Sequence, residues 1–365
     1  MSEIRLVNLR KEFKELVAIR DITITFPTAT VTCLLGPSGC GKTTLMRIIA
    51  GLEQPSSGEI YFDNELVNDL SPSERNIGMV FQYPVVYRGM DVYRNIELPL
   101  LQNSRISKAE RKARIESVIE TLDLTHAVGK DISTLDNGTR QKIAVARAVA
   151  RQPRIILFDE PITNVDVNSK VQLKRALKKL VKQHSQTIIY VTHDQTEAMT
   201  LADDIVLMQA GEIVQHGTPR EIYDYPNNRF GGWFLGNPGM NFVEHQVQHN
   251  DGAKYLSEPL FRQPVQVTGL NGHRQVLVGI RPERVRVQYE RTPFAIPGTI
   301  LKRSIVVGGQ HLLTIKVDGQ TIKAKVPPDA LFDEQTHVWV ECPLEHITLF
   351  EPEGRWFEAG LSYVD

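Results

Sequence analysis

The amino-acid sequence predicts an α/β protein in which a mostly parallel sheet, covered by helices on both faces, precedes a small all-β domain. β-rich runs alternate with helical patterns over the first 235 or so residues, which is typical of such a sheet. A glycine-rich turn at 36–44 joins a buried apolar run to a helical pattern. After about Gly236, short strand-like runs are separated by Gly, Pro, Asn and Asp, which predicts a barrel or sandwich.

The elements of the first domain follow from apolar periodicity and from helix stop signals. The run ATVTCLLG at 29–36 predicts a buried strand, and the next pattern predicts a helix over 42–50 that ends at Gly51. The later expected elements are a strand at 75–81, helices at 108–122 and 142–150, a strand at 154–158, a helix at 167–184, a strand at 187–192, a helix near 194–202 and a hairpin over 204–217.

The second domain is expected to consist of short strands. They are predicted at 274–280, 284–288, 311–317 and 337–342. We place the boundary in the stretch FLGNPGMNF at 234–242, where the composition changes. The predicted domains are therefore 1–235 and 236–365.

Charge and cysteine content limit the possible partners and compartments. Lys and Arg total 42 against 43 Asp and Glu, so the net charge is −1 and no overall basic field attracts nucleic acid or anionic lipid. Three cysteines form a sparse, odd set, which favours reduced thiols in a cytoplasm.

The charged N-terminus predicts no signal peptide, and no run of about 18 apolar residues is present. Any crossing of a membrane is therefore expected from other chains.

Residues 36–44, GPSGCGKTT, match the phosphate-binding pattern GxxxxGK[ST] between a predicted strand and a predicted helix. Glycines let backbone N–H groups turn inward around phosphate oxygens, and the helix N-terminus adds its dipole. Lys42 supplies a positive charge and Thr43 a hydroxyl ligand for Mg²⁺. The alternative is a purely structural glycine-rich turn. The loop residues predicted to contact the nucleotide are Gly36, Ser38, Gly39, Cys40, Gly41, Lys42, Thr43 and Thr44.

Two adjacent carboxylates follow another predicted strand. Four apolar residues at 155–158 precede Asp159 and Glu160, which emerge at the strand end where α/β sheets bind their ligands. We expect Asp159 to hold Mg²⁺ through water and Glu160 to orient and polarise an attacking water for in-line displacement. Such a pair could also cap a helix, but its position after a phosphate loop favours catalysis.

Over residues 1–235 the chain resembles the nucleotide-binding subunit of ATP-binding cassette (ABC) transporters. The resemblance depends on several landmarks in a fixed order, each of which is weak alone. They are Phe13, matching the aromatic that stacks on adenine; Gln82, matching the glutamine that touches Mg²⁺ and senses the membrane partner; 135–142, at the place of the LSGGQ-type signature; TNVD at 163–166, matching the loop that crosses the dimer interface; and His193, matching the switch histidine near the γ-phosphate.

Two further segments narrow the resemblance to importer ATPases of the maltose and glycerol-phosphate type. They are THDQTEAM, which begins at Thr192, and GIRPERV at 279–285. The resemblance implies a P-loop cassette with a helical subdomain, followed by a regulatory domain with an oligonucleotide-binding-like (OB-like) barrel. It assigns catalysis to Glu160, His193 and Gln82, Mg²⁺ to Thr43, Gln82 and Asp159, and ATP contacts to the loop residues above with Phe13, Asp136, Gly138 and Asp166.

The resemblance also implies a function and a set of partners. The chain would hydrolyse ATP to energise import of a sugar, polyol or polyol phosphate. It would sit peripherally at the cytoplasmic face of the cell membrane on two transmembrane permease subunits, which dock near 83–92, with an extracytoplasmic solute-binding protein and no nucleic acid. The alternatives are a soluble ABC ATPase acting on DNA or ribosomes, an exporter ATPase, and a mainly regulatory ATP-binding module.

The signature departs from the family pattern. The chain reads Leu135-Asp136-Asn137-Gly138-Thr139 instead of L-S-G-G-Q. In the family this segment caps the γ-phosphate bound by the other subunit. Here Asp136 would bring a carboxylate toward a polyanion, at a repulsion of about 4 kcal/mol for unit charges about 4 Å apart and an effective dielectric of about 20. We therefore expect a heterodimer with a second ATPase, as in paired-ATPase glycerol importers, rather than a homodimer with two weakened sites; neutral drift is the alternative.

Overall fold

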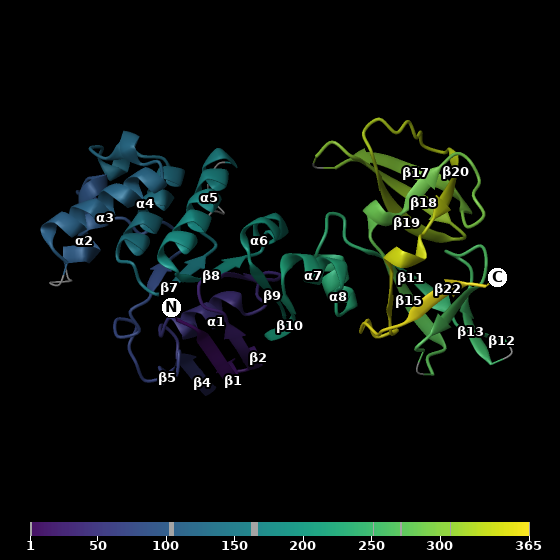
Figure 1. Cartoon of the computed structure of the whole chain (residues 1–365), viewed down its shortest axis with the longest axis horizontal. Coiled ribbons are helices and arrows are strands. Elements are labelled where there is room, and N and C mark those ends of the chain that lie inside the picture. Colours follow the sequence, from purple (N-terminus) through teal and green to yellow (C-terminus); the bar gives the residue numbers. More distant parts are fainter. Residues whose placement is uncertain are drawn as a thin grey trace. The chain divides into compact units, whose positions relative to one another are not determined.

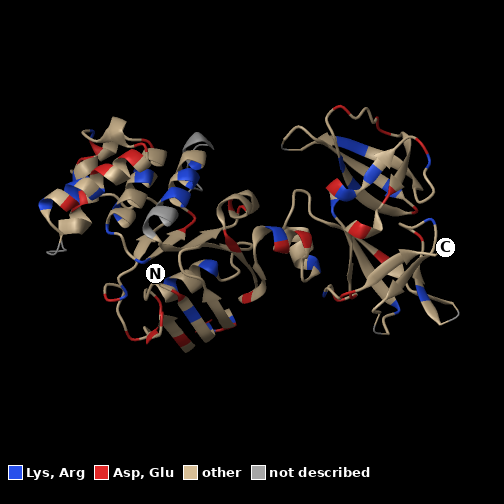
Figure 2. Cartoon of the chain, in the orientation of Figure 1, with Lys and Arg blue, Asp and Glu red and all other residues tan. Residues whose placement is uncertain are grey.

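The computed structural model describes residues 2–101, 106–161, 167–250, 252–270, 272–306 and 308–364 (Figure 1). The chain forms two compact units, Met1–Pro219 and Arg220–Asp365. Figure 2 shows basic and acidic residues interspersed in both units. Among the helices of the described ranges, none combines the length and the apolar character needed to cross a membrane.

The first unit is built on a six-stranded sheet. Its strands are β3 (Val31–Leu35), β6 (Gly78–Val80), β7 (Ile155–Asp159), β8 (Thr187–Thr192), β9 (Asp204–Gln209) and β10 (Glu212–Gly217). Their order is β10-β9-β3-β8-β7-β6, and every neighbouring pair is parallel except the β9–β10 hairpin. Every residue of β3, β7 and β8 is buried, which explains their continuous apolar runs.

A second, antiparallel sheet lies in the N-terminal part of the same unit, and the sequence patterns did not identify its strands. It comprises β1 (Ile4–Phe13), β2 (Leu16–Phe26), β4 (Ser57–Phe62) and β5 (Glu65–Leu66), in the order β2-β1-β4-β5. Helix α1 (Lys42–Ile49) buries four apolar side chains in a core shared with both sheets. The phosphate loop leads into α1, so this core holds the loop against the main sheet.

The remaining helices of the first unit are α2 (Val92–Leu101), α3 (Lys108–Thr121), α4 (Asn137–Ala150), α5 (Val167–His184) and α6 (Gln195–Leu201). Helices α2, α3 and α4 pack against one another as a helical subdomain. Helix α4 begins at Asn137, not at the expected residue 142, because Asp136 caps it: the carboxylate accepts the Thr139 N–H at 2.8 Å. Short 3₁₀ turns lie at Thr125–Ala127 and Ile132–Thr134.

The second unit is almost entirely β, as expected. One sheet contains β11 (Asn241–Gln246), β15 (Gln275–Ile280) and β21 (Ile347–Phe350). Another contains β12 (Gln248–Asn250), β13 (Ala253–Leu256), β14 (Val265–Thr268) and β22 (Gly360–Tyr363). The third contains β16 (Arg286–Gln288), β20 (His337–Glu341), β17 (Ile296–Ile305), β18 (His311–Val317) and β19 (Gln320–Val326). Apolar residues of all three sheets share one core. Short 3₁₀ turns lie at Pro282–Arg284 and Leu344–His346.

Two short helices, α7 (Pro219–Asp224) and α8 (Arg229–Phe234), precede these strands. Arg281, in the segment GIRPERV, is buried and donates from Nη1 to the carbonyls of Gly232, at 2.7 Å, and Leu235, and from Nη2 to that of Tyr223 at 2.7 Å. The Tyr223 hydroxyl in turn donates to Glu283. These contacts join both helices to the β-rich part, so the compact unit begins at Arg220, whereas the composition changes only at 234–242.

His245 gives the second unit a stability that depends on pH. Its side chain is 1% exposed against Phe261, and among the described residues neither ring nitrogen finds a hydrogen-bond partner. Burial lowers the pKa of His245 from 6.5 to about 4, so the unfolded chain binds the proton more tightly. The free energy of unfolding therefore falls as pH drops below about 6.5, by roughly 3 kcal/mol on reaching pH 4.

Urea unfolding followed by tryptophan fluorescence tests this, because all three tryptophans (Trp233, Trp339 and Trp356) belong to the second unit. His245→Leu is expected to flatten the pH dependence between pH 6.5 and 4. Equal pH dependence in the wild type and the variant would contradict this role of His245.

Candidate active site

The parallel strands of the main sheet bring the predicted catalytic segments to one edge. Strands β3, β8 and β7 are direct neighbours, so their carboxyl ends lie side by side. The phosphate loop follows β3, Glu160 follows β7 and His193 follows β8. Strand β6 pairs in parallel with β7, Val80 opposite Phe158, so Gln82 leaves the sheet beside Glu160. Segments from four separate stretches of sequence therefore lie at one sheet edge, where α/β proteins bind ligands.

Glycine is sterically required at two positions of the loop. A Cβ on Gly36 would lie 2.3 Å from the Met208 carbonyl oxygen. Gly41 has φ +108° and precedes the first residue of α1, and a Cβ there would lie 2.6 Å from the Ala18 carbonyl oxygen. Ser38 and Gly39 are exposed at the tip of the loop. The loop thus curls tightly against the sheet and presents its tip to solvent.

Lys42 is enclosed by this curl. Its side chain is buried, and Nζ donates to the carbonyl oxygens of Gly36 at 2.8 Å and Pro37 at 2.9 Å. Cys40 is also buried, with Sγ 3.8 Å from Nζ. Two neutral carbonyls do not neutralise a buried ammonium group, so the arrangement favours an anion at the mouth of the loop.

Thr43 and Asp159 form the part of the site suited to a divalent cation. Thr43 Oγ1 donates to Asp159 Oδ1 at 3.2 Å. Burial raises the pKa of Asp159, and the Thr43 hydrogen bond partly opposes that rise. Within the described ranges no group of three or more His, Cys, Asp and Glu is placed to hold a metal. One hydroxyl and one carboxylate nevertheless fit Mg²⁺, because that ion takes few protein ligands and completes its shell with phosphate oxygens and water.

Glu160 and His193 contact each other directly: Glu160 Oε1 lies 3.0 Å from His193 Nδ1. Glu160 has φ +44°, rare for a residue with a side chain, and its N–H donates to the Val191 carbonyl at 3.0 Å. The side chain of His193 is 47% exposed and that of Glu160 19%. A carboxylate held in an uncommon backbone conformation beside an accessible imidazole is typical of a catalytic position.

Residues on either side of His193 fix its backbone. Asp194 caps α6 by accepting the N–H groups of Thr196 at 2.7 Å and Glu197 at 3.1 Å. Thr192 Oγ1 accepts the Asp194 N–H at 3.0 Å and donates to buried Glu197 at 2.9 Å. Glu197 was not among the predicted site residues, although it lies within THDQTEAM. The acidic residue at i+3 after Asp194 is a capping-box signal that could have identified it.

Three other residues were expected to contact the nucleotide or its metal: Phe13, Gln82 and Asp166. Phe13 ends β1 with an exposed ring, and Lys11 Nζ lies 4.6 Å from the ring centroid. Gln82 is half-buried in the bend after β6. Asp166, with the rest of 163–166, lies outside the described residues. The roles of Phe13, Gln82 and Asp166, like those of the other site residues, stay predictions.

Asp136 turns its carboxylate toward its own helix. It accepts the backbone N–H of Thr139 and the Thr139 hydroxyl, both at 2.8 Å, and the N–H bond is the main cause of its lowered pKa. Asn137 is exposed and Gly138 is buried. Capping gives the Asp136 carboxylate a structural function that does not depend on a nucleotide.

The loop at 81–90 displays apolar side chains beside this site. Phe81, Tyr83, Val85 and Tyr87 are all exposed. Buried Asn95 holds the far end of the loop: its Oδ1 accepts the Tyr87 N–H at 2.8 Å and its Nδ2 donates to the Tyr87 carbonyl at 3.0 Å. A fixed loop with exposed aromatic groups suits a docking surface. Asn95 was not among the residues predicted to form this surface.

Comparison with known proteins gives family matches on both units. The ABC transporter family model matches residues 19–163, and the TOBE domain model matches residues 278–350. The trehalose/maltose import ATP-binding protein MalK of Thermococcus litoralis is 37% identical over 96% of this chain and 98% of its own length. The sn-glycerol-3-phosphate import ATP-binding protein UgpC 2 of Agrobacterium fabrum is 36% identical over 96% of this chain and 93% of its own.

Solved structures agree with these matches. The dimeric structure of MJ0796, a bacterial ABC transporter cassette, superposes with a TM-score of 0.54 at 30% identity, covering 60% of this chain and 99% of that chain. A post-hydrolysis state of the same cassette, bound to ADP and phosphate, gives the same values.

Proposed function

The chain belongs to the ABC transporter family, as an ATPase of the import ATP-binding type with a C-terminal TOBE domain, and on that premise we propose that it energises uptake of a sugar, polyol or polyol phosphate. The observation that supports the proposal best is the convergence at one sheet edge of the loop around Lys42, the Thr43–Asp159 pair and the Glu160–His193 pair. The names of the relatives support the substrate class.

We propose that each part of this edge has one task in hydrolysis. N–H groups of residues 36–44 and the Lys42 ammonium bind the phosphates, and Phe13 stacks on the base. Thr43, Asp159 and Gln82 would hold Mg²⁺, which supplies positive charge against the phosphate oxygens. Glu160 accepts a proton from water as the water oxygen bonds to the γ-phosphorus and the bond to the β–γ bridging oxygen breaks. His193 keeps the Glu160 carboxylate in place and contacts the γ-phosphate.

The loop at 81–90 is proposed as the contact with the transmembrane subunits. Its exposed aromatic groups would receive a segment of each permease subunit, and Gln82, in the same loop, would report docking to the ATP site. The chain would thereby sit at the cytoplasmic face of the membrane and serve a complex that includes an extracytoplasmic solute-binding protein.

The pairing with a second ATPase remains a proposal that depends on the altered signature. Capping by Asp136 removes part of its basis, because the carboxylate has a partner within its own helix. Two changes still predict that this segment binds a partner's γ-phosphate poorly. Asn137 replaces a glycine, and the serine hydroxyl of the signature is missing.

Native mass spectrometry of the complex, copurified from membranes through a tag on this chain, tests both proposals. We expect two transmembrane subunits, one copy of this chain and one copy of a different ATPase. Two copies of this chain would refute the pairing and leave the importer assignment in place. A complex that contains no transmembrane subunit would refute the importer assignment.

A further inference from the structure

We propose that Gln141 and Arg147, two side chains of α4, transmit movement of the docking loop at 81–90 to the signature segment at the start of that helix. The inference rests on the proposed function, because it takes the loop to be the contact with the transmembrane subunits. It assigns these residues a positioning role, since neither contacts the predicted catalytic groups.

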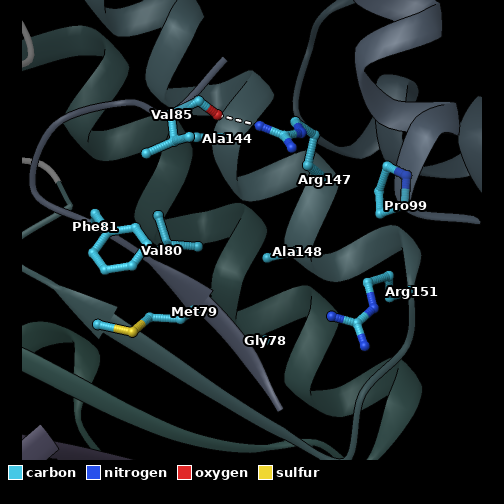
Figure 3. Close-up of a pocket in the computed structure, with 10 residues that line it drawn as sticks. All are labelled: Gly78, Met79, Val80, Phe81, Val85, Pro99, Ala144, Arg147, Ala148 and Arg151. Carbon is cyan, nitrogen blue, oxygen red and sulfur yellow. Dashed lines mark hydrogen bonds between the residues drawn. The ribbon is translucent and has the colours of Figure 1, made fainter. Parts of the chain in front are cut away.

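Two side chains of the helix bond to the backbone of the loop. Gln141 is 1% exposed, and its Nε2 donates to the Phe81 carbonyl at 3.2 Å, directly before Gln82. Arg147 donates from Nη1 to the Val85 carbonyl and places its guanidinium 4.4 Å from the centre of the Tyr87 ring. Figure 3 shows the Arg147–Val85 bond spanning from the helix to the loop.

Apolar packing between the loop and the helix is interrupted. An open pocket of about 190 Å³ is lined by β6, the start of the loop, Pro99 of α2 and residues of α4. On the helix side it is bordered by Ala144 and Ala148, whose side chains are small (Figure 3). A void removes the van der Waals contacts that would otherwise carry displacement across the interface. Beside this pocket, the polar contacts of Gln141 and Arg147 join the backbone of the loop directly to the helix.

The chemistry of Arg147 suits this role. Among the described residues no carboxylate lies within ion-pair distance of its guanidinium, so its charge acts on a backbone carbonyl and an aromatic face. Bonds from a charged donor and cation–π contacts are stronger than neutral ones. Helix α4 is continuous from Asn137 to Ala150, with Asp136 as its cap. A displacement of Val85 and Tyr87 would thus move the signature segment as part of one rigid helix.

Arg147→Ala tests the inference, with Arg151→Ala as the matched control. Arg151, four residues after Arg147, is the C-cap of α4 and borders the same pocket (Figure 3), but its guanidinium donates to Asn76 Oδ1 at 3.1 Å, outside the loop. Two rates are measured for each variant: ATP hydrolysis by the isolated chain, and hydrolysis by the chain in its copurified membrane complex.

Arg147→Ala is expected to keep the KM for ATP and the isolated rate within about twofold, and to lose roughly tenfold of the stimulation in the complex, a typical coupling between sites. Arg147→Lys keeps the charge and is expected to regain part of the stimulation, which a purely structural role would not explain. Arg151→Ala is expected to match the wild type.

Three outcomes would overturn the inference. Full stimulation of Arg147→Ala would show that the contacts do not couple the two segments. Equal losses in Arg147→Ala and Arg151→Ala would show a general effect on α4. A wild-type complex that is not stimulated would refute the proposed function and this inference with it, so the two failures are distinguishable. Folding is checked by amide exchange, which should rise in Arg147→Ala at 81–90 and not across α4.

Discussion

Glu160→Gln is expected to lower the rate of ATP hydrolysis by between about 10² and about 10⁴-fold while leaving ATP binding nearly unchanged, because an amide cannot accept the proton of the attacking water. Gln has almost the same shape as Glu, and the bond to the Val191 carbonyl of β8 is made by the backbone N–H. The unusual backbone at φ +44° is therefore expected to persist in the variant. The effect is large because the carboxylate oxygen itself, 3.0 Å from His193, is the group removed.

Phosphate release and nucleotide binding are measured in parallel for this variant. Glu212→Gln is the control, because Glu212 is an exposed carboxylate on the edge strand β10, which three strands separate from the β7 strand that carries Glu160 into the site. It should hydrolyse ATP at the wild-type rate. A Glu160→Gln variant that keeps more than about a tenth of the wild-type rate would assign the proton acceptor to another group.

Gly36→Ala is expected to weaken ATP binding by about 5- to 100-fold. An added Cβ would lie 2.3 Å from the Met208 carbonyl oxygen and 2.8 Å from Cys40 Sγ. The carbonyl belongs to strand β9 and cannot move aside, so the loop must shift. Overpacking of this kind costs about 1–3 kcal/mol, and about 1.4 kcal/mol corresponds to tenfold in affinity.

Titration with a fluorescent ATP analogue measures this effect. Gly129→Ala is the control: of the described residues outside its chain neighbours, none has a heavy atom within 4 Å of a Cβ added there, and its φ is not positive. It should bind nucleotide as the wild type does. Equal affinities of Gly36→Ala and the wild type would contradict the steric requirement at the base of the loop.

The sequence predicted those parts of the fold whose pattern is local. Strands β3, β7 and β8 are continuous apolar runs because both faces of their sheet are covered. The N-terminal sheet was not identified because β1 has several register shifts against β2, which break the regular alternation of apolar residues. The start of the second unit depends on Arg281, which bonds to carbonyls about 50 residues earlier in the chain. The amino-acid composition does not indicate a contact of this kind.

In the site, too, the local motifs could be predicted from the sequence, whereas contacts between distant segments could not. The phosphate loop and the Asp159–Glu160 pair are contiguous motifs, so residue type and spacing predict their chemistry. The Glu160–His193 contact and the bonds from Asn95 to the docking loop depend on the order of the strands and on helix packing. Asp136 is the instructive case: its charge suggests repulsion of a phosphate, whereas an Asp directly before a helical pattern is also a common N-cap residue.

Uptake by membrane vesicles tests whether this chain uses ATP hydrolysis to drive solute import. The copurified complex is placed in vesicles loaded with ATP, its solute-binding protein is added outside, and accumulation of labelled glycerol, sn-glycerol 3-phosphate, maltose and trehalose is measured. We expect ATP-dependent accumulation of at least one of these solutes, and its loss with Glu160→Gln. ATP-dependent accumulation of none of them, or equal accumulation by wild type and Glu160→Gln, would contradict it.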